Sequence, residues 1–381
     1  MQHVRRIIYA SDLPELREKE KKIEVDNFEG IDSFAAKNMS FNQAFSTYIS
    51  LMKPTYKNEH TYNNYLYRYN HYVRKSFGNL KVGQIKYSDI KRFYNEILFE
   101  KGYSLNTLET IHIIINPVFK LLVRDGIIRY NPVADVMKEM KKVWKGNIKK
   151  RRALTEKEQR VFLEFTRDNP VYMYWLPAYI ILLGTGLRVG ELVGLRWDDV
   201  DMERRIISVN HQMIYAKNEE KGVCERRITT PKTPNSIRQI PMLEIVYQAF
   251  LQQKEYQEQF WKCDVEIDGY KNFIFTSVNK NVYLPKTITE RINIICDAYH
   301  DEELKRAEEE NREPFILPHF SCHSLRHTFC TRLCENEVNV KVIQALMGHS
   351  DIKITLNIYA EVMENKTVET MIDLEGKIKI L

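Results

Sequence analysis

The sequence predicts a mainly α-helical protein with a small antiparallel β-sheet, an α+β fold divided into domains. Three observations support this fold class. Apolar residues recur at helical spacing through most of the 381 residues. Alternating β-branched residues appear between about residues 205 and 241. A basic segment, 141–152, separates two helical regions, and a chain of this length can bury more than one core.

The first region is predicted to be helical throughout. A polar amphipathic helix is expected over residues 13–25, before a loop that contains Gly30. The next helices are predicted over residues 41–52, 59–77, 87–101 and 105–125, and they are followed by Pro54, Gly78, Gly102 and Gly126. Proline and glycine end helices in this way. Most tyrosines of the region stand at helical spacing, so we expect them to lie in the core rather than to stack on bases.

The segment 141–152, KKVWKGNIKKRR, holds seven basic residues and no acidic ones. This composition predicts a linker that contacts a polyanion. After it, Thr155 and Glu158 form a capping box, which opens a new helix and a second domain.

The second domain is predicted to begin with helices and then to change period. Strands are expected over residues 205–215, 223–230 and 237–241, with a turn at 231–236. Helices return at 243–261 and 287–299 and dominate to the C-terminus. Residues 301–313 are so charged that we expect a solvated helix end or a flexible insert.

The net charge of +6 is unevenly distributed. Residues 41–152 hold 21 Lys and Arg against 8 Asp and Glu, a net of +13, whereas residues 1–40 have a net of −1 and residues 153–381 a net of −6. Charge concentrated in one segment favours a nucleic-acid partner over a solvated basic surface. The candidate phosphate contacts are Lys53, Lys57, Arg68, Lys91, Arg92, Lys149, Lys150, Arg151 and Arg152.

Several classes of protein are excluded or disfavoured. The N-terminus lacks the apolar run of a signal peptide. The most apolar segment, 172–187, contains Pro177 and is too short for a bilayer core of about 30 Å. The six cysteines contain no C-x-x-C pair, so reduced thiols are expected. We therefore expect a cytoplasmic protein with no membrane partner.

Four separated segments carry reactive residues. Residues 184–191, GTGLRVGE, place Arg188 and Glu191 three apart and so on one helix face. Residues 323–327, HSLRH, do the same for His323 and Arg326. Lys232 stands in the predicted turn, where a lysine is ordinarily only a solvated charge. Residues 346–351, LMGHSD, contain His349, and Tyr359 follows ten residues later.

The combined set is two arginines, two histidines, a lysine and a tyrosine, without a carboxylate cluster. Arginine forks bind phosphate bidentately and stabilise the charge that develops on its oxygens. Histidine and lysine can act as general base and general acid for a hydroxyl nucleophile and its leaving group. The set therefore predicts attack on a phosphodiester without a metal or other cofactor.

The segments GTGLRVGE, HSLRHTF and LMGHSDIKITLNIYA resemble those of the tyrosine recombinase (phage-type integrase) family, in the order found in that family. The TPKT turn around Lys232 resembles the family's lysine hairpin. The resemblance covers about residues 39–381 and is closest to the integrases of conjugative transposons. It implies a helical, SAM-like core-DNA-binding domain (39–140), a basic linker (141–152) and a catalytic domain with a C-terminal tail (153–381) that close as a clamp around DNA.

The resemblance also implies residue roles at the phosphate. Arg188 and Arg326 would clamp the scissile phosphate, and His349 would hydrogen-bond a non-bridging oxygen. Glu191 would orient the first segment.

The remaining roles concern proton transfer and the nucleophile. Tyr359 would form a 3′-phosphotyrosine, His323 would act as its general base, and Lys232 would protonate the leaving 5′-oxygen. The tyrosyl bond conserves the phosphodiester energy, so neither ATP nor a metal is expected.

A protein of this kind would integrate and excise a conjugative transposon or related mobile element. Its expected partners are double-stranded recombination sites, further copies of itself in a DNA-bound tetramer, and an accessory factor for excision. Residues 1–38 are expected to be the remnant of an arm-binding module whose strands are missing. The apolar residues of the tail, 362–381, are equally compatible with packing on the same chain or on a neighbouring protomer.

Two other functions are compatible with part of this set of residues. A zinc hydrolase would use His323 and His327 at i and i+4, with Cys330 and Cys334 further along the helix, but Ser324 replaces the glutamate of a zincin helix. A non-catalytic DNA-binding protein is the other alternative, although every matched position is filled. Type IB topoisomerases share the chemistry but lack this linker-joined helical domain.

Overall fold

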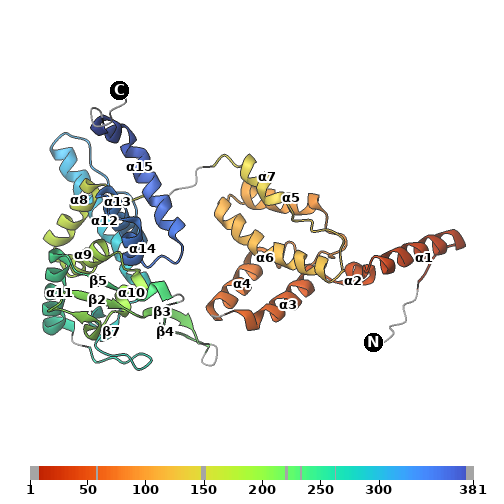
Figure 1. The fold of residues 1–381 in the computed structure, drawn as a ribbon, viewed down its shortest axis with the longest axis horizontal. Coiled ribbons are helices and arrows are strands. Elements are labelled where there is room, and N and C mark those ends of the chain that lie inside the picture. Colours follow the sequence, from red (N-terminus) through yellow and green to blue (C-terminus); the bar gives the residue numbers. More distant parts are fainter. Residues whose placement is uncertain are drawn as a thin grey trace. The chain divides into compact units, whose positions relative to one another are not determined.

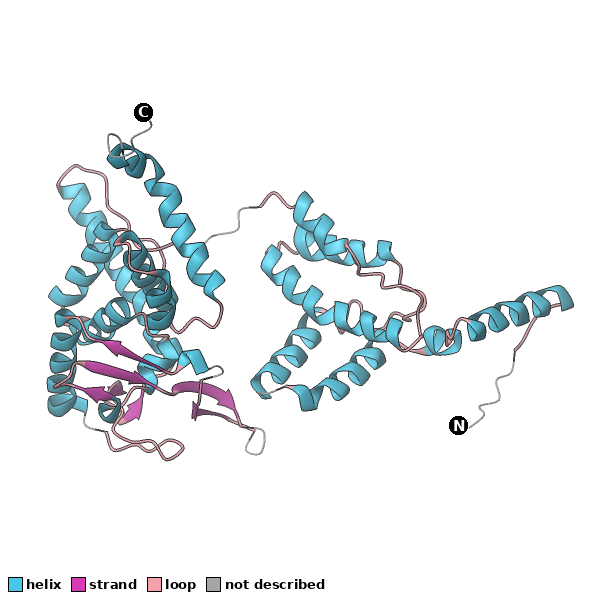
Figure 2. Cartoon of the chain, viewed as in Figure 1, coloured by secondary structure: helices cyan, strands magenta, loops and turns pink. Residues whose placement is uncertain are grey.

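The computed structural model describes residues 8–56, 59–146, 152–218, 222–231, 234–261 and 263–374. The chain divides into two units, residues 1–149 and 150–381. Within the described residues, the first unit contains helices, and the named strands belong to the second (Figures 1 and 2). The predicted fold class, mainly helical with small antiparallel sheets, is confirmed.

The helices of the first unit follow the predicted order. They are α1 (Leu13–Phe28), α2 (Ser33–Asn38), α3 (Phe41–Met52), a 3₁₀ turn (Lys53–Thr55), α4 (Glu59–Tyr72), α5 (Tyr87–Asn95), a π turn (Glu96–Glu100), α6 (Leu105–Arg124) and α7 (Val136–Val143). Ser40 and Gln43 cap α3 reciprocally, and Gly102 and Gly126 adopt the positive φ that ends a helix.

The core of this unit is largely aromatic. The ring of Phe41 packs on Phe77 and Phe119, and Phe45 stacks on Tyr69 with 3.5 Å between ring centroids. Tyr69 is buried, as its helical spacing predicted. Helix α4 ends at Tyr72, five residues before the predicted end at Phe77. The backbone continues in tight turns that keep both Val73 and Phe77 in the core.

The second unit combines three small antiparallel sheets with helices. Its helices are α8 (Glu156–Asp168), α9 (Leu176–Thr185), α10 (Val189–Gly194), α11 (Glu244–Tyr256), α12 (Pro285–Glu309), α13 (Cys322–Glu335), α14 (Val340–Met347) and α15 (Ile352–Leu374). Its short turns are the 3₁₀ turns Met173–Trp175, Trp197–Asp199 and Pro234–Ser236 and the π turn Gln257–Trp261. Its strands are β1 (Val200–Asp201), β2 (Ile206–Val209), β3 (Gln212–Lys217), β4 (Cys224–Thr229), β5 (Arg238–Pro241), β6 (Thr276–Ser277) and β7 (Asn281–Val282).

The strand predicted over residues 205–215 is two strands in two sheets. β2 pairs with β1 and β5, with Ile207 opposite Ile240, whereas β3 pairs with β4. The break falls at His211, whose buried ring bonds the carbonyl of Gly194 at 2.7 Å and so turns the chain towards α10. The strands on either side of residues 231–236, β4 and β5, therefore lie in different sheets and do not pair with each other.

The charged segment 301–313 is mostly a helix end. Helix α12 runs ten residues past its predicted limit, to Glu309. The side chain of Glu303 is buried, where it accepts hydrogen bonds from the guanidinium of Arg312 and, at 2.8 Å, from the backbone N–H of Phe315. This ion pair holds the following loop against the helix.

None of the helices in the described part of the chain is both long and apolar enough to cross a membrane.

Candidate active site

The first reactive segment forms the start of α10. Gly186 adopts a positive φ of 63°, which turns the chain out of α9, and Arg188 becomes the N-cap of α10. The backbone N–H of Arg188 donates to Oε2 of Glu191 at 2.9 Å, and its Nη1 donates to Oε1 at 2.7 Å. The carboxylate thus fixes both the backbone and the side chain of Arg188.

The carboxyl end of α14 gathers three arginines, here called the arginine cluster: Arg188, Arg238 and Arg326. The backbone carbonyls of three consecutive residues at this helix end each accept a hydrogen bond from one arginine of the cluster. The carbonyl of Leu346 accepts from Nε of Arg238 at 2.7 Å, that of Met347 from Arg326, and that of Gly348 from Nη2 of Arg188 at 3.0 Å. Carbonyls at a helix end lack partners within the helix and carry its negative dipole charge, so they attract cations.

Arg326 of α13 is the most enclosed member of the arginine cluster. Its Nη1 also donates to the carbonyl of Gly186, which ties α13 to the turn before Arg188. Burial, together with the positive charge of Arg188, lowers the pKa of Arg326 to about 9. The guanidinium is therefore desolvated and close to a like charge, and a bound anion would favour its charged form.

Glu191 is the carboxylate that the arginine cluster surrounds. Burial raises the pKa of Glu191, but hydrogen bonds and charge from Arg238 and charge from Arg188 lower it further, so that the net pKa shift is downward. The side chain therefore stays ionised. Three guanidinium groups and one carboxylate leave an excess of positive charge at the site.

His349 follows the three carbonyls directly and is 7% exposed. Its Nδ1 lies 2.9 Å from the hydroxyl of Thr355 on α15. Burial lowers the pKa of His349 to about 4, and the charges of Arg326, Arg188, Arg238 and His323 contribute in the same direction. The imidazole is therefore neutral near pH 7, and these interactions place His323 in the neighbourhood of the arginine cluster.

Tyr359 lies on α15 and is half-buried. It packs on an apolar cluster made by the buried side chains of Phe329, Cys330, Cys334, Ile343, Met347 and Val362. Two of these side chains also reach the first segment, because a Cβ built on Gly186 would lie 2.6 Å from the ring of Phe329 and 2.9 Å from the sulfur of Met347. The helix of the predicted nucleophile is thus packed against the elements that hold Arg326.

The structure brings together Arg188, Glu191, His323, Arg326 and His349 from three separate segments. Lys232 lies outside the described residues, as do four of the predicted DNA contacts, Lys57, Lys149, Lys150 and Arg151. The roles assigned to these five stay predictions.

The other predicted DNA contacts fall into two groups. Lys53, Arg68 and Arg92 are exposed. Lys91 instead pairs with Glu139 at 2.7 Å, and Arg152 binds Glu158 through both Nη atoms, at 2.7 and 2.5 Å.

The residues proposed for a zinc site do not form one in the described part of the chain, where no group of three or more His, Cys, Asp or Glu side chains is placed to hold a metal ion. Nδ1 of His327 is 3.3 Å from the hydroxyl of Thr331. Cys330 and Cys334 are buried and hydrogen-bond each other.

Arg238 was not predicted as a site residue. The alternation along β5 is the signal that indicates it, because Arg238 and Ile240 share the buried face whereas Gln239 and Pro241 are exposed. An arginine on the inward face of a strand requires a buried acidic partner. Glu191 is that partner, 47 residues earlier in the chain.

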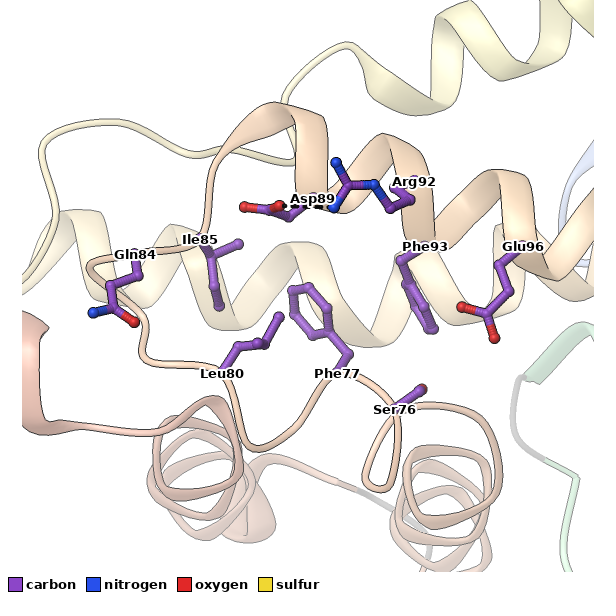
Figure 3. Close-up of a pocket in the computed structure, with 9 residues that line it drawn as sticks. All are labelled: Ser76, Phe77, Leu80, Gln84, Ile85, Asp89, Arg92, Phe93 and Glu96. Carbon is purple, nitrogen blue, oxygen red and sulfur yellow. Dashed lines mark ion pairs between the residues drawn. The ribbon is translucent and has the colours of Figure 1, made fainter.

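Two cavities of the described residues are lined by side chains other than those of the arginine cluster. Figure 3 shows the first, of about 260 Å³, in the helical unit beside α5, where Phe77 and Phe93 form its apolar wall and Arg92 and Glu96 stand at its edge. The second, also about 260 Å³, lies between Arg152 and helices α13 and α15.

Comparison with known proteins identifies the family. A model described as phage integrase family matches residues 152–366, more than half of the chain. The chain belongs to the phage integrase family. A second model, described as phage integrase N-terminal SAM-like domain, matches residues 40–98 of this family member. The resemblance predicted from the three segments is confirmed, and the protein is a tyrosine recombinase, an enzyme that cleaves and rejoins DNA strands.

Individual relatives lead to the same family. The transposase from transposon Tn916 of Enterococcus faecalis is 32% identical over 349 residues, which cover 92% of this chain and 80% of that protein. A tyrosine recombinase XerC-like protein of Caldanaerobacter subterraneus is 28% identical over 335 residues, covering 82% and 78%. Among solved structures, Tn1549 transposon integrase in complex with transposon right end DNA has a TM-score of 0.72 and 29% identity, covering 88% of this chain and 100% of that one.

Proposed function

We propose that this recombinase integrates and excises a conjugative transposon or a related mobile element, through a 3′-phosphotyrosine bond at Tyr359. The observation that carries the proposal is the arginine cluster, in which the guanidiniums of three segments surround one buried carboxylate beside a neutral histidine. The similarity to the Tn916 transposase and to Tn1549 integrase supports the type of element.

The scissile phosphate is bound by Arg188, whose side chain is 37% exposed, and by Arg326, which is buried beneath it in the free protein and is reached as the phosphate enters the cluster. Both guanidiniums donate to backbone carbonyls, which fixes their direction, and a guanidinium has five N–H donors, so others remain for an anion. Fixed donors stabilise the charge of the pentacovalent transition state without reorganisation.

His349 donates to a non-bridging oxygen from Nε2. A neutral imidazole carries one proton, and its position depends on the partner of the other nitrogen. When the Thr355 hydroxyl donates to Nδ1 across 2.9 Å, the proton is on Nε2. The low pKa of His349 keeps this neutral form dominant.

The reaction conserves bonds and protons. The oxygen of Tyr359 attacks phosphorus while its proton passes to His323, a P–O bond to Tyr359 forms, and the bond to the 5′-oxygen breaks. Lys232 supplies the proton to that oxygen. A 5′-hydroxyl from a second strand reverses these steps, so the chemistry requires neither ATP nor metal.

DNA binding is assigned mainly to the first unit. Residues 39–140 form a core-DNA-binding domain, and the exposed Lys53, Arg68 and Arg92 contact phosphates. Residues 141–152 are the linker, and 153–381 the catalytic domain. The protein acts in the cytoplasm as a tetramer on double-stranded recombination sites, and an accessory factor directs excision.

The decisive experiment traps the enzyme on a nicked suicide substrate, from which the cleaved strand dissociates. Tryptic digestion of the adduct should yield the phosphopeptide that contains Tyr359. An adduct on any other residue, or cleavage without an adduct while the protein binds DNA, would overturn the proposed chemistry.

A further inference from the structure

Arg238 belongs to the arginine cluster, and its guanidinium is held by protein groups. Its side chain is 5% exposed, whereas that of Arg188 is 37% exposed. Three different nitrogens of Arg238 donate to groups from three parts of the chain. Nε binds the carbonyl of Leu346 at 2.7 Å, Nη1 binds the carbonyl of Ser236 at 3.1 Å, and Nη2 binds Glu191 at 2.8 Å.

We propose that Arg238 is a positioning residue for strand cleavage, which occupies the carboxylate of Glu191 and so keeps the guanidinium of Arg188 directed at the scissile phosphate. The inference rests on the proposed function. It adds a role for a residue that itself touches neither DNA nor the reacting atoms.

The carboxylate of Glu191 is shared by two arginines, Arg188 and Arg238. Oε1 accepts from Nη1 of Arg188 at 2.7 Å and from Nη1 of Arg238 at 3.2 Å. Oε2 accepts from the backbone N–H of Arg188 at 2.9 Å and from Nη2 of Arg238 at 2.8 Å. Each oxygen of Glu191 therefore accepts one hydrogen bond from Arg188 and one from Arg238.

Removal of Arg238 would leave that carboxylate short of donors in a buried site. An unpaired buried carboxylate is costly, and Arg188 is the other arginine that is hydrogen-bonded to it. A guanidinium binds a carboxylate best through two parallel N–H groups. Arg188 would then turn into a two-point pair with Glu191 and would lose the orientation needed for phosphate.

Arg238 also holds the segment that leads to His349. A Cβ built on Gly348 would lie 3.0 Å from Nη1 of Arg238 and 3.1 Å from the carbonyl of Asn235, and Gly348 has a φ of 60°. The C-terminal end of α14 therefore packs directly on the side chain of Arg238. The guanidinium of Arg238 therefore links three parts of the chain: Glu191, the residues just before His349, and the loop before β5.

The test measures single-turnover cleavage of the suicide substrate and, separately, DNA affinity. Arg238→Gln should cleave about 10- to 100-fold more slowly, the effect of losing a charged hydrogen bond, with DNA affinity within about 2-fold. Adding Glu191→Gln should restore about 5-fold or more of the lost rate, because it removes the charge that captures Arg188. A purely structural role would make the double variant slower still.

Further variants keep the outcome interpretable. Arg238→Lys retains the charge, but one ammonium group cannot donate to all three acceptors at once. Its cleavage rate should therefore lie between those of Arg238→Gln and the wild type. It serves as the test if Arg238→Gln does not fold. Arg204→Gln, at a side chain that is 82% exposed, is the matched control and should cleave normally.

The results separate the two proposals. A wild-type rate in Arg238→Gln or Arg238→Lys, or no recovery in the double variant, would overturn the role of Arg238 while the wild-type adduct at Tyr359 still stands. Absence of that adduct from the wild type would instead overturn the proposed function.

Discussion

The basic residues of the helical unit and the arginine cluster of the second unit carry the same charge in opposite surroundings. The segment 41–152 has a net charge of +13, and three of its predicted DNA contacts are exposed. The arginine cluster lies in a region, 153–381, whose net charge is −6, and its members are held by carbonyls and by one buried carboxylate. Net charge therefore does not locate the chemistry.

The exposed and the enclosed charges are expected to act on DNA in different ways. Exposed charges act on a polyanion through their number, and salt screens them. Enclosed charges act through fixed direction in a region of low dielectric constant, and salt affects them less. The following variants test whether affinity and cleavage separate along this division.

The largest effect is expected from Tyr359→Phe. Phenylalanine keeps the packing of the half-buried ring but removes the nucleophilic oxygen, so the variant should form no covalent adduct. DNA affinity, measured by fluorescence anisotropy, should match the wild type. An adduct formed at the wild-type rate would contradict the assignment.

Arg188→Lys should lower the single-turnover cleavage rate by about 100- to 1,000-fold, because a point charge cannot replace a planar fork held by Glu191 and Gly348. Arg204→Lys, at a side chain that is 82% exposed, is the matched control and should cleave normally. Equal rates for the two variants would remove the distinction between the enclosed and the exposed arginines.

A triple substitution, Lys53→Gln with Arg68→Gln and Arg92→Gln, should act on affinity alone. The plot of log affinity against log salt concentration should become less steep by about 2 to 3, close to 0.9 for each lost phosphate contact. Cleavage at saturating DNA should be unchanged. If the salt slope stays the same, these side chains do not contact phosphate.

The smallest effect is expected in the pH dependence of stability. The pKa of His349 is about 4 in the folded protein and near 6.5 when unfolded, so the unfolded state binds more protons between these values. The free energy of unfolding should fall as pH drops from about 6.5 to about 4, by up to about 3 kcal/mol from this residue. His349→Asn should flatten this part of the profile in chemical denaturation. An unchanged profile would mean that the imidazole is not enclosed by the cluster.

Local patterns predicted much of the fold. Ser40 and Thr155 begin helices α3 and α8, and Gly348 ends α14, because caps and terminators act within three or four residues. The same local rules missed the division of residues 205–215 into two strands. That break depends on a hydrogen bond from His211 to Gly194, 17 residues away.

The sequence by itself determined the helical class, the basic segment, and the three motifs that carry the family resemblance, since each of these is visible in residue type and short spacing. Only the tertiary structure decided that Lys91 and Arg152 form ion pairs with carboxylates, and that Arg238 pairs with Glu191. The reason is distance along the chain. Arg188 meets the carbonyl of Gly348 across 160 residues, and no local periodicity records which buried charge will find which partner.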